Sequence, residues 1–360
     1  MRIKTTVWIL LFLAFALGSH AQTVRKYSNE FLKIGVGARA AAMGNAQVGI
    51  VNDVTSGYWN PGGLALAPDA PEVALMHSEY FAGIAKYDYV GFTMPIGNDR
   101  RFGASVIRLG VDDIANTLNL VDANGNIDFD AVETFSVADL GIMMSVAQRL
   151  EILGGLNVGA NFKVVNRTVG KFANAWGFGV DLGARWESEN LQLGVMISDL
   201  TSTFNAWTFN TETFEEAFVQ TGNVIPENSL EVTLPSIKMG GGYKFLSNKK
   251  VNILVAVDND VHFDGKRNVI ANLGPVSIDP HAGVEISYDN IAFLRGGFKN
   301  LQQVPNARGE DVYSVFPTIG AGFQLRNLYV DYALSNVGNF SQTLYSHVFS
   351  LKYTFRQFKR

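Results

Sequence analysis

The 360-residue chain contains no cysteine, which excludes a disulfide scaffold, a cysteine-ligated metal site and a cysteine nucleophile. Charged side chains are also scarce, at 17% against the roughly one quarter that is usual in globular proteins. The formal net charge of −4 provides no basic field, which argues against a nucleic-acid partner. The composition therefore indicates a chain whose surroundings tolerate apolar surface.

Long apolar runs are missing after the first residues of the chain. Val7 to Leu17 is an unbroken apolar run behind the basic residues Arg2 and Lys4, and Ser19-His20-Ala21 provides the small residues of a cleavage site. A transmembrane anchor is the alternative, but it needs about 20 apolar residues. We expect residues 1–21 to be a signal peptide and the mature chain to begin at Gln22, with no lipid anchor because no cysteine follows. A mature chain without apolar helices meets a membrane as a barrel.

What the sequence does have is glycine, 36 residues in all, and strict alternation of polar and apolar residues. From Trp176 to Trp186, one face of the predicted strand reads Trp, Phe, Val, Leu, Ala, Trp and the other reads Gly, Gly, Asp, Gly, Arg. Alternation of this kind indicates a β-strand with one apolar and one polar face.

This pattern recurs and predicts fourteen strands. They span 71–79, 86–95, 101–111, 136–148, 156–164, 176–186, 191–198, 237–245, 251–258, 282–288, 291–298, 317–325, 328–334 and 347–355. The gaps between them alternate in length, with tight turns such as 187–190 and 289–290 and long gaps at 112–135, 201–234, 261–278 and 299–316. Short turns on one rim and long loops on the other are typical of an outer-membrane barrel, with both chain ends on the periplasmic side.

A soluble β-sandwich alternates as well. Two features favour the barrel: many polar-phase positions hold Gly, Asn or Ser, and Trp176 and Trp186 lie on one face, ten residues apart. At about 3.3 Å per residue and a tilt of about 40°, these tryptophans span roughly 25 Å, the height of a membrane's apolar band. We therefore predict an all-β fold, a transmembrane antiparallel up-and-down β-barrel of about 14 strands over residues 71–360.

Residues 22–70 precede the first strand and do not alternate. Because a barrel of fourteen strands leaves a lumen, we expect this segment to lie in it as an N-terminal plug or hatch. Two motifs stand out, Gly35-x-Gly37-Ala38-Arg39-Ala40-Ala41-Ala42-Met43-Gly44 and Trp59-Asn60-Pro61-x-Gly63-Leu64.

These two motifs resemble the PorV/PorQ family of Bacteroidetes outer-membrane proteins, which are similar to FadL-type fourteen-stranded barrels with an N-terminal hatch. The resemblance is specific over residues 31–66 and architectural beyond them. It implies a structural role in the plug for a set of motif residues: Gly35, Gly37, Arg39, Met43, Gly44, Trp59, Asn60, Pro61 and Gly63. It also implies a role in type IX secretion, with the translocon and cargo proteins as partners.

Three charged residues share the polar phase of neighbouring predicted strands, namely Lys163, Asp181 and Arg185. We expect them to face the lumen, where charged groups need partners. They either form an ion-pair network that holds the plug or select a solute.

The gap 201–234 carries a group of aromatic residues among glutamates: Phe204, Trp207, Phe209, Phe214 and Phe218. Thr213 to Gln220 fits a short amphipathic helix. A loop of this length is usually functional, so it is a candidate partner loop for a protein or a hydrophobic solute. A lid folded over the barrel mouth is the alternative.

Other motifs do not indicate a catalytic or cofactor site. The Gly35-x-Gly37-x-x-Ala40 pattern lacks the preceding strand of a dinucleotide fold, and the remaining histidines show no zinc spacing. In the acidic loop 112–135, the run from Asp122 to Asp128 has its glycine at the wrong place for a calcium loop, and a polar hairpin tip explains it as well. We expect no enzyme activity and no cofactor.

Two functional hypotheses follow. The first is a non-enzymatic outer-membrane barrel associated with type IX secretion, which binds translocon components or cargo. The second is a FadL-like transporter of hydrophobic small molecules, with an apolar cavity between plug and wall. A purely structural barrel is a third possibility.

Overall fold

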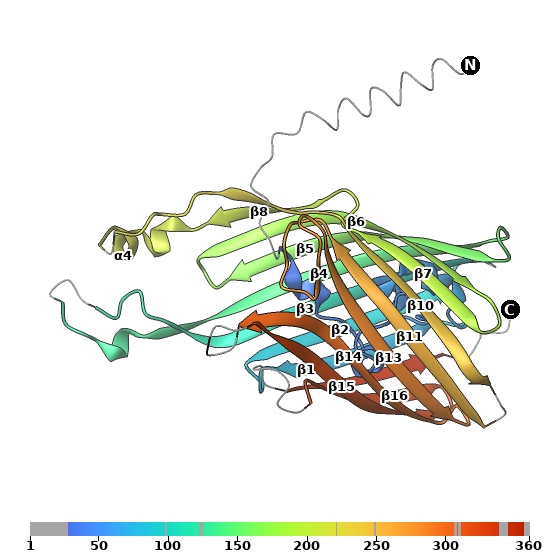
Figure 1. Cartoon of the computed structure of the whole chain (residues 1–360). Helices are drawn as coiled ribbons and strands as arrows, with labels where there is room; N and C mark the ends of the chain where they lie inside the picture. Colours follow the sequence, from blue (N-terminus) through green and yellow to red (C-terminus); the bar gives the residue numbers. More distant parts are fainter. Residues whose placement is uncertain are drawn as a thin grey trace, which may run out of the picture.

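A single antiparallel sheet closes on itself and forms the body of the molecule, as the computed structural model shows (Figure 1). The structure describes residues 28–97, 99–121, 125–220, 222–247, 250–305, 308, 311–337 and 345–355. The first half of the sheet contains β1 (Glu72–Tyr80), β2 (Ala85–Pro95), β3 (Arg100–Asn116), β4 (Glu133–Leu150), β5 (Leu156–Val169), β6 (Ala173–Glu187), β7 (Leu191–Ser198) and β8 (Thr203–Phe209). The second half contains β9 (Ser229–Thr233), β10 (Ser236–Ser247), β11 (Val251–His262), β12 (Ala271–Asn272), β13 (Ser277–Tyr288), β14 (Ala292–Pro305), β15 (Asp311–Leu325), β16 (Leu328–Ser335) and β17 (Ser346–Thr354).

These elements make a closed barrel of 14 strands among the described residues. β7 and β8 both pair with β6 and form one interrupted barrel strand, and β9 and β10 form the next one. β12 is a two-residue addition to β13. β17 pairs with β1 and closes the ring, so the predicted fold and strand number are confirmed.

The alternation in the sequence separates the two faces of the wall. On β6, Trp176, Phe178 and Leu182 are 53%, 54% and 40% exposed on the outside, whereas Asp181 and Arg185 are buried on the inside. Large apolar side chains are exposed on the outside of most other strands too, which is the surface of a transmembrane barrel. Within the described ranges, no helix is long and apolar enough to cross a membrane.

The two rims differ, as the gap lengths predict. One rim carries short connections between strands, which the structure describes in full at 151–155, 188–190, 289–291 and 326–327. We call it the short-turn rim. The opposite, long-connection rim carries α4 (Glu215–Gln220) and η4 (Thr211–Thr213) at 210–228, and η3 (Phe129–Ala131) at 117–132 (Figure 1).

The predicted long gaps are partly wrong, because strands extend into them. β3 continues to Asn116 and β4 begins at Glu133, while β8 and β9 occupy much of the gap 201–234. β14 and β15 likewise extend to Pro305 and from Asp311. Beyond the apolar band both faces of a strand meet water, so alternation fades, although antiparallel pairing still satisfies the main-chain groups.

The barrel wall is uneven in height. β3 and β4 have 17 and 18 residues, whereas β16 and β1 have 8 and 9. A tall wall therefore runs from β3 through β6 to β8 and β9, and a low wall runs from β16 through β17 and β1 to β2 (Figure 1).

The N-terminal segment, residues 28–70, lies inside the ring of strands (Figure 1). It contains η1 (Glu30–Lys33), α2 (Ala38–Ala42), α3 (Ser56–Trp59) and η2 (Pro61–Leu66). α2 contacts β14 to β17 and η2 contacts β3 to β6, on opposite sides of the barrel. The expected short helix near Ala38 to Met43 is therefore present as α2.

Inward glycines bring the wall close to this segment. A Cβ at Gly283 or Gly297 would lie 2.4 Å or 2.5 Å from main-chain atoms of Met43, and one at Gly194 would lie 2.1 Å from the Val48 carbonyl oxygen. The abundance of glycine thus has a packing cause, because the segment lies directly against the strand backbone.

Candidate functional site

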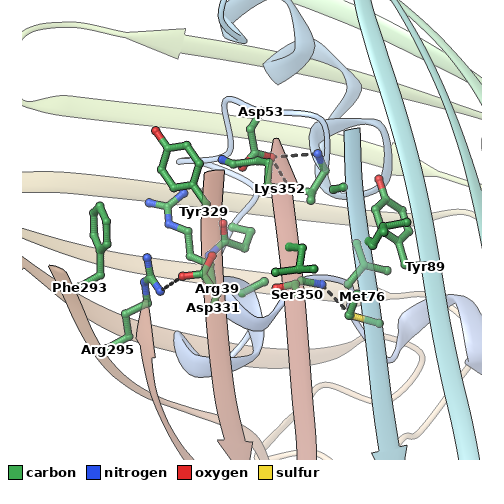
Figure 2. Close-up of a pocket in the computed structure, with 18 of the residues that line it drawn as sticks. Arg39, Asp53, Met76, Tyr89, Phe293, Arg295, Tyr329, Asp331, Ser350 and Lys352 are labelled. Atoms are coloured by element: carbon green, nitrogen blue, oxygen red, sulfur yellow. Dashed lines mark hydrogen bonds and ion pairs between the residues drawn. The ribbon is translucent and has the colours of Figure 1, made fainter. Parts of the chain in front are cut away.

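Two cavities lie on opposite sides of the N-terminal segment and share no lining residue. The upper cavity, about 550 Å³, lies toward the long-connection rim and is lined by Glu30, Lys33, Ile34 and Asn45 of the segment. The lower cavity, about 390 Å³, lies toward the short-turn rim and is lined by Val36, Arg39, Gln47 and Asp53 among others (Figure 2). Both are within the size range of small-molecule sites.

One side of the upper cavity is apolar. It consists of residues near the tips of the low wall and on β3, namely Tyr80, Phe81, Ile84, Ala85, Leu109 and Val111, while Phe316 of β15 lies next to Lys299 as its strand partner. Phe81 and Ile84, at the turn between β1 and β2, are 47% and 64% exposed. The cavity thus has an apolar wall where the barrel is lowest.

The opposite side of the upper cavity is polar, and its groups are incompletely paired. Lys299 on β14 is only 7% exposed and has no ion-pair partner within 4.0 Å in the described part of the chain. Asp279 Oδ1 and His281 Nδ1 on β13 are buried without a hydrogen-bond partner. Buried polar groups are normally hydrogen-bonded, so this wall has unused capacity for a ligand or water.

Lys33 and Arg267 line the same cavity, but they are paired. Lys33 Nζ lies 2.8 Å from Glu30 Oε1, and Arg267 Nη2 lies 2.6 Å from Asp264 Oδ2. Burial lowers the pKa of Lys33, and the neighbouring Glu30 carboxylate partly opposes it. Lys299 is therefore the cation of this cavity that is left for a ligand.

The lower cavity contains a chain of ion pairs from the segment to the wall (Figure 2). Arg39 Nε lies 2.8 Å from Glu285 Oε2, and Arg295 Nε lies 2.6 Å from the same oxygen. Arg295 Nη1 lies 2.5 Å from Asp331 Oδ1. Glu285 thus joins the arginine of α2 to the arginine of β14, and each charge in the chain has a partner.

A second ion pair fixes the segment to β17. Lys352 Nζ lies 2.6 Å from Asp53 Oδ2, and its ammonium lies 4.3 Å from the centroid of the Tyr329 ring. Burial by itself would raise the pKa of Asp53, but the Lys352 ammonium outweighs it and holds the pKa well below the usual range. Burial raises the pKa of Tyr58 to about 12, so this phenol stays neutral.

The first motif of the sequence lies between the cavities. Gly35 has φ +105, and a Cβ there would lie 2.7 Å from Asn45 Nδ2. The Asn45 side chain in turn donates to the Ile34 carbonyl at 3.0 Å. Gly44 has φ +63, and its Cβ would lie 2.3 Å from the Phe298 carbonyl oxygen, so both positions require glycine.

The remaining contacts of this motif fix the segment to β1, β17 and the glycines of β13 and β14. The Gly37 amide donates to Met76 Sδ and the Ala38 amide to Ser350 Oγ, both at 2.9 Å. Met43 is fully buried against Gly283 and Gly297.

The second motif closes the segment on itself and on β6. Trp59 Nε1 donates to the Val36 carbonyl at 2.9 Å, and Asn60 Nδ2 donates to the Val48 and Ala184 carbonyls at 3.0 Å each. Pro61 begins η2, and Gly63 packs against the Val51 carbonyl oxygen. The motif residues thus hold the segment's shape and its contact with the wall.

Lys163 and Asp181 meet inside the wall, with Lys163 Nζ at 2.7 Å from Asp181 Oδ1 and 2.6 Å from Asp199 Oδ1. Asp199 lies where β7 is interrupted before β8. These pairs link neighbouring strands of the wall, and Asn161 connects them to the segment, because it donates to Asp181 Oδ2 at 3.3 Å and to the Gly57 carbonyl at 2.7 Å. Arg185 is buried but is not part of this network, since its Nη2 lies 3.5 Å from Glu187.

The five aromatic residues of the predicted partner loop do not form one surface. Phe204, Trp207 and Phe209 belong to β8, where Trp207 stacks on Phe209 and donates to Glu231 Oε2 at 2.8 Å. Phe214 is buried against Phe172 and Phe218. The expected helix over Thr213 to Gln220 is present in part as α4.

Sequence reasoning missed several residues of the lower cavity. Glu285, Arg295, Asp331 and Lys352 lie on inward positions of predicted strands, the same signal that singled out Lys163. Asp258 was missed in the same way, and its Oδ2 accepts from the Gln47 and Val48 amides at 2.6 Å and 2.7 Å.

The structure offers no support for a cation site. Residues 122–124 of the acidic loop lie outside the described residues, as do residues 1–27 with the predicted signal peptide. Among the residues that are described, no group of three or more histidine, aspartate or glutamate side chains is arranged to hold a metal ion.

Comparison with known proteins finds similar folds among solved structures of transporters and channels. No protein-family model and no curated protein matches the chain. The toluene transporter TbuX of Ralstonia pickettii is 14% identical with a TM-score of 0.55, and the alignment covers 89% of this chain and 99% of TbuX. The monoaromatic hydrocarbon channel CymD is 13% identical with a TM-score of 0.57, covering 90% of this chain and 98% of CymD.

A Pseudomonas aeruginosa FadL homologue is also similar, at 12% identity and a TM-score of 0.50, with 89% of this chain and 98% of the homologue covered. At these identities the similarity concerns the fold. It supports the FadL-like barrel of the sequence resemblance, and none of the three structures is described as a PorV/PorQ protein.

Proposed function

We propose that this protein is a non-enzymatic outer-membrane transporter of hydrophobic small molecules. The observation that carries the proposal is the upper cavity, in which an apolar wall faces the buried and unpaired Lys299. The similar barrels support it, because TbuX is described as a toluene transporter and CymD as a monoaromatic hydrocarbon channel. This reading replaces the secretion role as the leading hypothesis.

The chemistry of the upper cavity defines the substrate class. Tyr80, Phe81, Ile84 and Phe316 provide area for an apolar body, whose burial contributes about 25 cal/mol per Å². The Lys299 ammonium can donate a hydrogen bond to an acidic or polar group at one end of the substrate. Such a charge-assisted hydrogen bond is stronger than one between neutral groups. The preferred substrate therefore has an apolar body and one acidic or strongly polar group.

The N-terminal segment acts as the gate in this proposal. A molecule in the upper cavity meets Ile34 and Asn45, and the lower cavity begins on the other side, at Val36 and Gln47. Val36 is fully buried, so this part of the segment separates the two cavities. Transport then requires the segment to shift away from the wall, with residues 22–70 as the plug and 71–360 as the barrel.

Uptake in whole cells tests the proposed function. We would express the full chain in a bacterium that lacks its own FadL-type barrel and measure uptake of labelled toluene and labelled decanoate. Uptake should exceed that of the empty strain several-fold for at least one probe. Uptake at the level of the empty strain, with the protein folded in the outer membrane, would show that the proposal is wrong. N-terminal sequencing of the same material tests cleavage before Gln22.

Association with type IX secretion is the second candidate. Its support is the PorV/PorQ-like motif, whose Arg39, Trp59 and Asn60 make the contacts described above. The lumenal Lys163–Asp181 pair would then be structural and not solute-selecting. Recovery of translocon or cargo proteins with the barrel from its native outer membrane would favour this candidate, and recovery of lipids and unrelated porins alone would oppose it.

A further inference from the structure

The outer edge of β9 has no strand beside it. β9 pairs with β8 on one side. On the other side, β11 ends at His262, which pairs with Ser236 of β10, so β11 stops before it reaches β9. In the described part of the chain, no main-chain hydrogen bond reaches this edge of Ser229–Thr233. A free edge offers a row of N–H and C=O groups to another extended chain.

Three features that often protect a free strand, lysine, proline and a bulge, are missing within β9 itself. The sequence of β9, Ser-Leu-Glu-Val-Thr, contains no lysine and no proline, and its pairing with β8 has no bulge. The side chain of Glu231 faces the lumen, where its carboxylate accepts a hydrogen bond from Trp207 and forms an ion pair with Arg167. On the outer face, Leu230 is 51% exposed. Pro226 and Pro235 flank the strand and limit the edge to a short segment.

The hairpin that carries this edge has charged side chains of one sign. From Thr203 to Thr233 the chain has five glutamates and no lysine or arginine. Arg267, which lies beside Thr233, is neutralised by Asp264 and Glu30, at 2.6 Å and 3.2 Å. A patch of one sign attracts a partner of the opposite sign and accelerates its association.

A second copy of the chain does not fit the edge. Two copies in one membrane are related by an axis along the membrane normal, which keeps their β9 strands pointing the same way. The same edge of each strand would then face its copy, and pairing between like edges requires antiparallel strands. The occupant is therefore a different chain.

We propose that the free edge of β9 binds a basic, extended segment of another polypeptide as an added strand. The main-chain groups of β9 provide the pairing, and the glutamates of the 203–233 hairpin select positive charge. Leu230 contacts the side chain opposite it on the outer face of the bound segment and the diagonal neighbours of that side chain. The site is an edge of the barrel wall, and its binding of a peptide does not require transport.

A designed peptide tests this proposal on the purified full chain in detergent. The probe is a fluorescent seven-residue peptide of alternating lysine and valine, and its binding is followed by fluorescence anisotropy. We expect saturable binding that weakens with salt. The same peptide with N-methyl groups on alternate residues keeps its charge but loses its pairing, so its affinity should fall at least tenfold. Equal binding of the two peptides would overturn the proposal, as would equal binding of a glutamate–valine peptide.

Substitutions then locate the binding. The double charge reversal Glu212→Lys and Glu227→Lys changes two exposed side chains and should weaken binding at least tenfold. Glu151→Lys, at an exposed turn on the opposite rim, is the matched control and should change nothing. Because the chain has no cysteine, Leu230→Cys should crosslink to a peptide that carries one cysteine, and Leu153→Cys on the short-turn rim should not. Crosslinking at Leu153→Cys with none at Leu230→Cys would contradict the proposal.

Discussion

The upper and lower cavities are formed by one barrel and one N-terminal segment, yet their electrostatics differ. In the lower cavity Arg39, Glu285, Arg295 and Asp331 form a continuous chain of pairs, and Asp53 pairs with Lys352. In the upper cavity Lys299 is buried without an ion-pair partner among the described residues. Paired charges hold the groups that carry them in fixed positions, whereas a buried charge without a partner can still bind a ligand. Under the proposed function, the lower cavity attaches the segment to the wall and the upper cavity binds the substrate.

Locking the segment to the wall should have the largest effect. In the double variant Ala38→Cys and Ser350→Cys, the two positions are in contact, because the Ala38 amide donates to Ser350 Oγ at 2.9 Å. If the segment must move, oxidation should reduce uptake to the level of the empty strain, and reduction should restore it. The single-cysteine variants are the controls. Normal uptake by a variant whose crosslink is verified by mass spectrometry would show that the segment is not the gate.

Breaking one ion pair of the lower cavity should have the next largest effect. Lys352→Met leaves the Asp53 carboxylate buried without its cation, and such a loss costs about 3–5 kcal/mol. We expect the free energy of unfolding, measured in detergent with a denaturant, to fall by this amount. The double variant Asp53→Asn and Lys352→Met removes both charges and should recover most of the loss. An equal loss in the double variant would mean that packing, and not charge, is what Lys352 contributes.

Much of this fold follows from the sequence, because a period of two residues marks each strand that passes through the apolar band. Residues of the cavities were harder to predict, since they come from many strands and meet only when the barrel closes. Lys299 illustrates the limit. It falls in the predicted gap 299–316, where alternation had faded, although β14 continues to Pro305. The inward positions of Glu285 and Arg295 could have been predicted from the alternation of their strands. The chain of ion pairs that joins them to Arg39 could not.

The glycines of β14 allow a test of segment packing with a built-in control. A Cβ at Gly297 would lie 2.5 Å from the Met43 carbonyl carbon, whereas one at Gly296, on the opposite face, would meet nothing closer than 3.8 Å. Gly297→Ala should therefore destabilise the protein by about 1–3 kcal/mol, as overpacking does. Gly296→Ala should be close to neutral. Thermal unfolding in detergent compares the two, and equal midpoints would show that the segment is not held tightly against β14.

The smallest effect is expected for a substitution of Lys299, and this substitution tests the difference between the two cavities most directly. Lys299→Met keeps an apolar stem in the upper cavity but removes the charge that an acidic substrate would pair with. Decanoate binding should weaken about tenfold, which corresponds to about 1.4 kcal/mol, while toluene binding should not change. Lys86→Met, which removes an exposed lysine paired with Asp112, is the control. Equal losses for decanoate and toluene would mean that Lys299 shapes the cavity and does not select charge. Because the lower cavity has no such unpaired cation, no substitution of its paired residues should separate the two substrates in this way.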